Sequence, residues 1–196
     1  VTWDATSGKT IEEYEGHISS AAAFSPDGRY ICALDSGQAG GEFYLLDLET
    51  EAGGDPRQML PDPEAGQPLY DAGAHAVFSK DGALLAFTSV AWGARGVAVY
   101  EVASMSELWS LEYEMEDPET DLWDAQEVAF SPDGKTLVVG VEGQIRAFDA
   151  RNGEPRTSIE VDREGVPPYF ALDSERRRVW VSHEGAPYHY VWPEDW

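Results

Sequence analysis

A six-residue pattern recurs along the chain and constrains its fold more than any other feature. The pattern reads AFSPDG at residues 23–28, VFSKDG at 77–82 and AFSPDG at 129–134, and a degenerate fourth copy reads YFALDS at 169–174. Self-similarity at intervals of 40–54 residues indicates a repeat protein, in which each unit buries its apolar surface against its neighbours. The sequence therefore predicts four similar structural units.

Each Asp-Gly pair predicts a tight turn between two strands. The aspartate side chain bonds its own backbone, and glycine accepts a positive φ without steric cost. The predicted second strands lie at 30–34, 84–88, 136–139 and 178–182, and the third strands at 43–47, 97–101, 145–149 and 189–193. Fourth strands are predicted at 108–113 and 157–161, and the chain opens with strands at 1–4 and 10–14. Four short antiparallel strands per unit are typical of β-propeller blades.

The sequence resembles the WD-repeat (WD40) family. Trp3-Asp4 and Gly16-His17 match the two dipeptides of that family, and FSPDG matches its first hairpin. The resemblance implies an all-β β-propeller with four-stranded antiparallel blades over one domain, 1–196. Its units are expected at 10–48, 57–102, 108–150 and 157–193, after the end of a preceding blade at 1–5. Because Leu46, Tyr100 and Phe148 replace the family's tryptophan, a related propeller family with the same hairpin is the alternative.

The resemblance also implies structural roles for the signature residues. These are Trp3, Asp4, His17, Asp27, Gly28, Asp81, Gly82, Asp133 and Gly134.

The strand order predicts an incomplete ring. Each unit runs from an outer strand through three inner ones, so the strand at 10–14 pairs with 1–4 and the last unit lacks an outer strand. Exposed strand edges promote further pairing. We therefore expect about four blades of a larger seven- or eight-bladed ring, completed by the same or another chain. The alternative is a closed four-bladed monomer, in which 10–14 leaves 1–4 and completes the last blade.

The charge restricts the class of partner. With 37 acidic and 13 basic residues the chain has a formal charge of −24, which repels nucleic acids and anionic membranes. A basic protein or a cation would be attracted by this negative charge. The alternative explanation of the charge is that it serves solubility alone. The sequence contains no run of 18 apolar residues, so no membrane span is predicted. A cytoplasmic location is expected.

The motifs of common enzymes are missing. The sequence holds no Gly-x-Ser-x-Gly elbow, Walker loop or Rossmann fingerprint, and the lone cysteine, Cys32, lies in an apolar strand where a buried inert thiol is expected. We therefore predict no catalytic residues, no cofactor and no metal site.

The long connections predict a binding face. Segments 61–73, 89–96 and 114–125 exceed the tight turns at the opposite ends of the blades and fall on one face. Aromatic residues and arginine anchor protein interfaces because they bury much area at low entropic cost. Capping of the blades by the tryptophans is the alternative. The candidate partner-binding residues are Tyr70, Trp92, Arg95, Asp117, Glu119, Asp121 and Trp123.

The histidines suggest no definite site. His17 and His75 are interpreted as structural. The spacing of His183 and His189 permits a metal or acid–base role, although a solvated loop is the preferred interpretation because no third ligand is identifiable.

Together these features predict a non-enzymatic scaffold that binds a protein partner, possibly a basic one, on its acidic and aromatic face. Two alternatives stay open: a propeller-based enzyme or ligand or metal sensor, and a regulatory sensor segment of a larger signalling or defence protein. The fold does not decide between them.

Overall fold

The structure of the protein is a computed structural model. The described residues are 2–3, 6–12, 18–37, 40–49, 57–59, 75–91, 94–114, 127–141, 144–161, 169–173, 175–183 and 186–191. Every regular element within these ranges is a β-strand, which confirms the all-β prediction. The same ranges contain no helix of the length and hydropathy that a membrane span requires.

Within the described ranges, seventeen strands form one two-stranded hairpin and four antiparallel sheets. The hairpin consists of β1 (Thr2–Trp3) and β2 (Thr10–Glu12). Blade 1 contains β3 (Ile18–Phe24), β4 (Tyr30–Gly37), β5 (Gly40–Asp47) and β6 (Arg57–Met59). Blade 2 contains β7 (Ala76–Phe78), β8 (Leu84–Ala91), β9 (Ala94–Glu101) and β10 (Ser106–Glu114). Blade 3 contains β11 (Val128–Phe130), β12 (Thr136–Val141), β13 (Gln144–Asp149) and β14 (Pro155–Glu160). Blade 4 contains β15 (Tyr169–Asp173), β16 (Arg178–His183) and β17 (Ala186–Val191).

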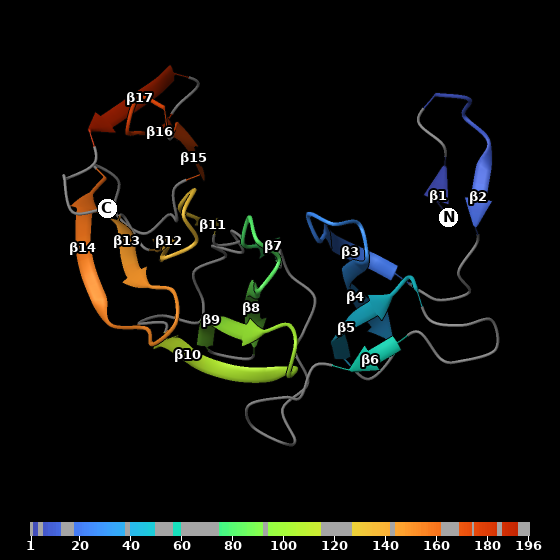
Figure 1. The fold of residues 1–196 in the computed structure, drawn as a ribbon. Helices are drawn as coiled ribbons and strands as arrows, with labels where there is room; N and C mark the ends of the chain where they lie inside the picture. The colour runs from blue at the N-terminus through green and yellow to red at the C-terminus, as the bar shows by residue number, and fades with distance from the viewer. Residues whose placement is uncertain are drawn as a thin grey trace.

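The blades stand side by side along an arc (Figure 1). Within each blade the strands follow chain order. The first strand of blade 2, β7, contacts the first strands β3 and β11 of the two neighbouring blades. The hairpin β1–β2 lies beyond blade 1, at the N-terminal end of the arc (Figure 1). Because β2 pairs with β1, the expected pairing of the opening strands is confirmed.

The first reversal of blade 1 is built by a serine and an aspartate. The Ser25 hydroxyl donates to Asp27 Oδ1 at 2.6 Å and accepts from the Tyr30 N–H at 2.8 Å. Asp27 Oδ1 also accepts from the Arg29 N–H at 3.0 Å. Gly28 has a φ of +76°, which favours glycine. The predicted Asp-Gly turn is therefore confirmed, with the preceding serine as an additional part.

Blades 2 and 3 repeat this geometry. Ser79 donates to Asp81 at 2.6 Å and accepts from the Leu84 N–H at 2.9 Å. Ser131 and Asp133 form the corresponding bond at 2.7 Å. In all three blades the serine hydrogen bond is the largest cause that holds the pKa of the aspartate below its usual value.

Blade 4 reverses differently, and its predicted alignment was wrong by two residues. Leu172 pairs with Val179 as Phe24 pairs with Ile31, so Leu172 rather than Phe170 occupies the position of the repeated phenylalanine. Without an Asp-Gly pair, the turn uses Asp173, which accepts from the Arg176 N–H and guanidinium, both at 3.1 Å. The left-handed residue is Arg177, with a φ of +51°.

One predicted long loop is part of a hairpin. Residues 89–91 end β8 and residues 94–96 begin β9, with Ala91 paired to Ala94. The alternation of these residues continues the ladder, so segment 89–96 is not the long loop that was predicted. The segments 61–73 and 115–125 lie outside the described residues.

Both faces of the sheets of blades 2 and 3 pack against neighbouring blades. We call the face toward the preceding blade the leading face and the face toward the following blade the trailing face. The leading face of blade 2 contributes Phe78, Leu85 and Tyr100 to a core that includes Cys32 and Leu45 of blade 1. The trailing face of blade 2 joins blade 3, and that of blade 3 joins blade 4. The hydrophobic core therefore lies between the sheets rather than inside them.

An indole ring joins blades 2 and 3 at their outer ends. Trp109 of β10 donates its Nε1–H to the Ala150 carbonyl at 3.0 Å and lies 5.9 Å from the Phe148 ring, centroid to centroid. A Cβ on Gly153 would lie 2.8 Å from Trp109 Cδ2. The absence of a side chain at residue 153 is thus what admits the indole ring.

We expect Ser79→Ala to destabilise the protein. Ser79 is fully buried, and its loss leaves the Leu84 N–H without that acceptor, which costs about 1–3 kcal/mol of unfolding free energy. Thermal unfolding followed by circular dichroism measures the loss. Ser104→Ala is the matched control, because Ser104 is exposed and its hydroxyl donates to the exposed carboxylate of Glu101, so about 0.5 kcal/mol or less is expected. Equal losses in the two variants would contradict the role of the reversal.

Acid should destabilise the fold in a defined pH range. Hydrogen bonds hold the pKa of Asp27, Asp81 and Asp133 below the unfolded value of about 3.9. The stability that these carboxylates provide is complete above that value and is lost as the pH falls through the lower folded-state pKa. The unfolding temperature, measured from about pH 5 to pH 2, should fall below about pH 4. Ser131→Ala should reduce this fall, since it releases Asp133; an unfolding temperature that stays constant below pH 4 argues against the assignment.

Gly153→Ala should destabilise more than Gly28→Ala. Both glycines have positive φ, +72° and +76°, so both variants incur backbone strain of about 1–2 kcal/mol. Only at Gly153 does the added methyl also displace Trp109, whereas nothing lies within 4 Å of the position at Gly28. Chemical denaturation should show an excess loss of about 1–3 kcal/mol for Gly153→Ala. Similar midpoints for the two variants would refute the packing role of the indole.

Candidate functional site

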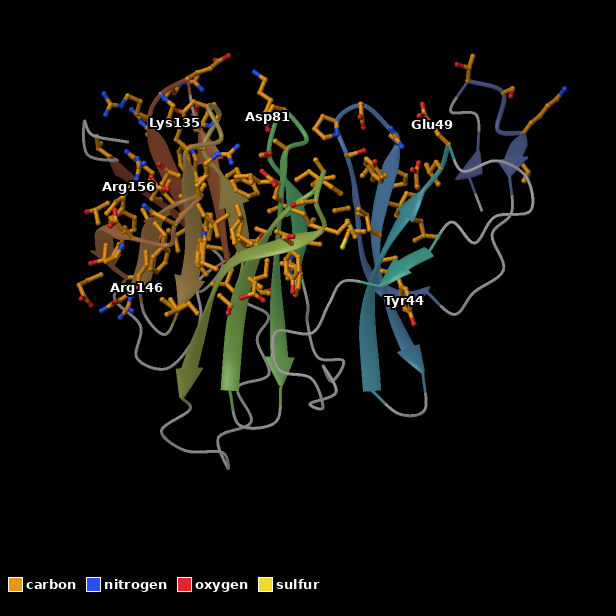
Figure 2. The ribbon with its side chains drawn as sticks, turned by 60° about the horizontal axis from the view of Figure 1, so that its bottom comes forward. Tyr44, Glu49, Asp81, Lys135, Arg146 and Arg156 are labelled. Atoms are coloured by element: carbon orange, nitrogen blue, oxygen red, sulfur yellow. The ribbon has the colours of Figure 1, made fainter. Side chains whose placement is uncertain are left out.

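The strand ends define two faces of the blades. The turn face holds the turns after the first and third strands, within residues 6–9, 25–30, 47–49, 79–84, 101–106, 131–136, 149–156, 173 and 175–178. The loop face lies at the opposite strand ends, where blades are connected to each other and second strands join third strands. Asp81, Lys135 and Glu49 mark the turn face in Figure 2.

Asp47 organises the turn face of blade 1. Its carboxylate accepts two bonds from the Arg29 guanidinium, at 3.1 and 2.8 Å, and one from the Glu49 N–H at 3.0 Å. The Arg29 bonds are the largest cause that lowers the Asp47 pKa, and they raise that of Arg29. Arg29 also lies over the Tyr30 ring, 4.9 Å from its centroid. The aspartate thus ties the third strand to the first turn.

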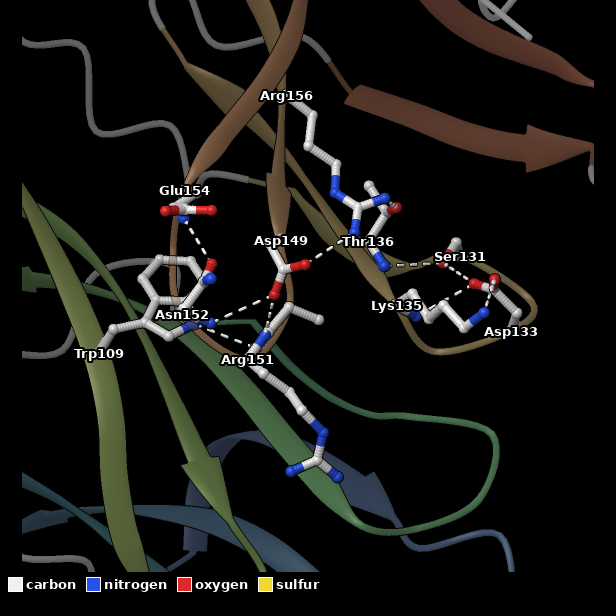
Figure 3. Close-up of polar contacts among 11 residues, drawn as sticks. Trp109, Ser131, Asp133, Lys135, Thr136, Asp149, Arg151, Asn152, Glu154 and Arg156 are labelled. Atoms are coloured by element: carbon white, nitrogen blue, oxygen red, sulfur yellow. Dashed lines mark hydrogen bonds and ion pairs between the residues drawn. The ribbon is translucent and has the colours of Figure 1, made fainter. Parts of the chain in front are cut away.

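Asp149 has the same place in blade 3 (Figure 3). It accepts from the Arg156 guanidinium at 2.7 Å and from the Arg151 N–H at 2.9 Å. Arg156 also donates to Thr136 Oγ1 at 3.1 Å, and its bond to Asp149 is the largest cause that lowers the Asp149 pKa. Arginine therefore joins the third and fourth strands to the second strand here.

A cation from blade 3 compensates blade 2. Glu101 occupies the position of Asp47, but Ala83 stands where blade 1 has Arg29. Arg151 approaches Glu101 at 3.7 Å, and its charge also contributes to the lowered pKa of Asp81. Such an exposed pair adds little stability. The pair does balance the charge of Glu101 at the boundary between blades 2 and 3.

The two signs of charge are distributed unequally over the molecule. The described residues of the turn face include ten carboxylates and nine cations, a net charge of −1. The carboxylates are Asp27, Asp47, Glu49, Asp81, Glu101, Asp133, Asp149, Glu154, Asp173 and Glu175. The cations are Lys9, Arg29, Lys80, Lys135, Arg151, Arg156, Arg176, Arg177 and Arg178. Because the whole chain has 37 acidic and 13 basic residues, the other 27 carboxylates are accompanied by only four cations.

The predicted partner-binding residues mostly lie outside the described part of the chain. Only Arg95 is placed: it belongs to β9 and pairs with Val90 and Tyr113. It therefore sits near the loop-face end of blade 2, and its role in partner binding stays a prediction. The residues outside the described ranges are Tyr70, Trp92, Asp117, Glu119, Asp121 and Trp123.

The predicted structural residues are partly described. The three Asp-Gly pairs form the reversals above. Trp3 belongs to β1, whereas Asp4 and His17 lie outside the described residues.

The histidines do not form a site in the described residues. His183 and His189 lie in strands β16 and β17 rather than in a solvated loop, and they pair with Ala186 and Trp180 respectively. The exposed His189 ring lies 5.0 Å from the Trp180 ring, centroid to centroid. His75 joins the sheet through its backbone, which exchanges bonds with Thr88 at 3.0 and 2.8 Å. Among the described side chains, no group of three metal-ligating residues lies together.

The thiol behaves as expected. Cys32 is fully buried in the core between blades 1 and 2, and burial raises its pKa to about 12. The predicted burial of this thiol is therefore confirmed, and a thiol buried in an apolar core is a poor nucleophile.

Sequence reasoning missed several residues that shape the turn face. Ser25, Ser79 and Ser131 precede each turn at a fixed spacing, and this regularity is the signal that could have identified them. Asp47 and Asp149 follow the apolar residue that replaces tryptophan, so the second half of the family dipeptide marked them. Nothing in the sequence pairs Trp109 with Gly153, which are 44 positions apart.

One family model matches the sequence. The model for the WD domain, G-beta repeat, matches residues 8–38. No curated protein sequence matches the chain.

Many solved structures share the fold. The β-propeller domain of Cps50 (Swd1) from Myceliophteria thermophila is 16% identical, with a TM-score of 0.61 over 98% of this chain and 58% of that one. The Dos1 propeller is 15% identical, with a TM-score of 0.61 over 96% of this chain and 46% of that one. TolB from Acinetobacter baumannii is 19% identical, with a TM-score of 0.53 over 84% of this chain and 37% of that one.

The chain thus spans between about a third and three fifths of these structures. Its sheets match only part of each propeller. The chain therefore carries a WD40 repeat at residues 8–38 and folds, along its described residues, as part of a β-propeller.

Proposed function

We propose that the chain is a non-catalytic propeller scaffold that holds a basic protein on its loop face. The observation that carries this proposal is the unequal charge distribution. The described residues of the turn face are nearly neutral together, so almost all of the −24 charge belongs to the other residues of the chain. A field of one sign attracts a partner of the opposite sign and accelerates its association.

The bonding of the turn face supports the same choice of face. Its aspartates accept backbone N–H groups and arginines of their own blades, so these groups already serve the fold. A partner there would compete with existing bonds. The loop face is the face that receives the connections between blades, and connections of this kind carry most binding residues in proteins.

The proposal extends to the ring. Because the matched propellers are longer than this chain, further blades from the same or another chain would complete a ring of seven or eight. Partner binding then uses a face that several blades share. The candidate contact residues are those predicted from the sequence: Tyr70, Trp92, Arg95, Asp117, Glu119, Asp121 and Trp123.

Double substitution of Trp92 and Trp123 by alanine should abolish partner capture. Aromatic anchors contribute about 2 kcal/mol or more each to interfaces, which corresponds to roughly a 30-fold loss of affinity per residue. Affinity purification with quantitative mass spectrometry compares the variant with the unchanged chain, and the thermal transition should remain within about 2 °C.

The control alters the turn face without changing the net charge. Lys80→Ala with Glu154→Ala removes one charge of each sign from exposed turn positions and should retain the partner. Retention of the same proteins by the tryptophan variant would refute the loop face as the binding surface.

A further inference from the structure

The fourth strand of blade 2 forms a long open edge of its sheet. β10 contains 9 residues, whereas β6 contains 3 and β14 contains 6. It is the end strand of its sheet, and among the described strands it pairs with β9 alone. Figure 1 shows β10 on the outer side of blade 2. The outer N–H and carbonyl groups of an edge strand can pair with a strand of another chain.

The register of the sheet determines which backbone groups of β10 point outward. The Val102 N–H donates to the Ala83 carbonyl at 2.9 Å, so the backbone of Val102 is directed toward β8. Antiparallel strands alternate in this direction along the chain, and Val99 is therefore directed toward β10 and bonds its partner Trp109. From Trp109 onward the pairing is regular. The residues whose N–H and carbonyl groups point away from β9 are Ser110, Glu112 and Glu114.

The sequence of β10 is acidic and contains none of the usual blocks to strand addition. It reads SELWSLEYE, with three glutamates and with no lysine, arginine or proline. Two of the three outward positions are glutamates. The fourth strand of blade 3 differs, because β14 begins with Pro155 and contains Arg156 beside the single carboxylate of Glu160. Proline and basic side chains protect sheet edges from pairing, so β10 is the less protected of these two edges.

The two sides of β10 specify the side chains that an added strand should have. A paired strand places its side chains alternately on the same two sides as its neighbour. Residues opposite Glu112 and Glu114 are best basic, since opposite charges stabilise a cross-strand pair. On the other side, Trp109 and Leu111 pack against the core between blades 2 and 3 and are only partly buried. The intervening residues of the added strand are therefore best apolar.

A second copy of this edge does not meet these requirements. Two paired β10 strands would bring six glutamates together without any cation, and like charges across a strand pair are destabilising. The glutamates thus disfavour pairing between copies of this chain. The same charges favour a basic strand, which makes the edge selective.

We propose that the outer edge of β10 binds an extended segment of another protein, in which basic and apolar residues alternate, as an additional strand of blade 2. Backbone hydrogen bonds to Ser110, Glu112 and Glu114 supply affinity, and the charges of the two glutamates select the segment. The inference goes beyond the proposed function, because it concerns the rim of one blade. It depends neither on the loop face nor on completion of the ring.

Synthetic peptides provide the test. A fluorescent peptide of about eight residues that alternates lysine and valine should bind the chain saturably, as measured by fluorescence anisotropy. A peptide that alternates glutamate and valine should not bind. N-methylation of all lysines and N-methylation of all valines block opposite edges of the peptide, so one of these modifications should abolish binding and the other should preserve it. Absence of binding, or equal binding of the two methylated peptides, would overturn the proposal.

A pair of proline variants locates the peptide on the protein. Glu112→Pro removes an outward N–H without breaking a bond to β9, and it should weaken binding of the lysine–valine peptide by roughly 10-fold or more. Glu160→Pro is the matched control, since Glu160 has the equivalent outward position in β14 and the same charge is lost. The control should change the affinity by less than about 2-fold. Equal affinities of the two variants would overturn the assignment to β10.

Two measurements on the unchanged chain keep the proposal testable if Glu112→Pro does not fold. The lysine–valine peptide should slow hydrogen exchange at the amides of Ser110, Glu112 and Glu114; exchange rates that stay the same would overturn the proposal. Light scattering of the chain alone should show no dimer through β10. A dimer in which these amides become protected would overturn the choice of occupant in favour of a second copy.

The test separates this surface from the loop face. The variant with both Trp92 and Trp123 replaced by alanine should bind the lysine–valine peptide as the unchanged chain does. Loss of peptide binding in that variant would place the peptide on the loop face and overturn the inference. Failure of partner capture on the loop face leaves the peptide measurements unchanged, so the two proposals fail separately.

Discussion

The structure depends on one constraint: a four-stranded sheet on its own leaves both faces exposed to water and needs a neighbouring sheet to bury each of them. In blade 2 the side chains of β7, β8 and β9 alternate between two cores, one shared with blade 1 and the other with blade 3. Each sheet therefore acts as a layer, and its stability resides in contacts with its neighbours. The alternation of apolar residues on both faces follows from this position, as does the need for turns short enough to let adjacent sheets approach.

The turns satisfy this need through side chains that bond the backbone. Serine and aspartate close the first reversal in three blades, and aspartate with arginine closes the turn after the third strand in blades 1 and 3. These groups are charged but locally compensated. As a result, the described residues of the turn face have a net charge close to zero, while the excess of carboxylates belongs to the remaining sequence. Structural demands on one face thus help to determine where an electrostatic partner is expected to bind.

The sequence allowed the all-β class, the repeat and most strand positions to be predicted, because Asp-Gly turns and apolar alternation are local signals. The limits are equally physical. Leu172 replaces the repeated phenylalanine without a local mark, since only cross-strand pairing reveals the two-residue offset. Segment 89–96 was interpreted as a long connection, although the ladder continues to Ala91 and Ala94. The contacts of Trp109 with blade 3 connect distant positions and carry no periodic signal. Most candidate partner-binding residues remain predictions.

The indole between blades 2 and 3 has a consequence for how such a sequence can diverge. Trp109 occupies the space that a side chain at residue 153 would need, so these two positions are sterically coupled across a blade boundary. A lineage that exchanges the tryptophan for a smaller residue would release the constraint on the glycine, except for its left-handed backbone. Conversely, a lineage that keeps the ring can accept little variation at position 153. Correlated change at these two sites would therefore record an inherited neighbour relationship between blades, independently of the motifs that define each repeat.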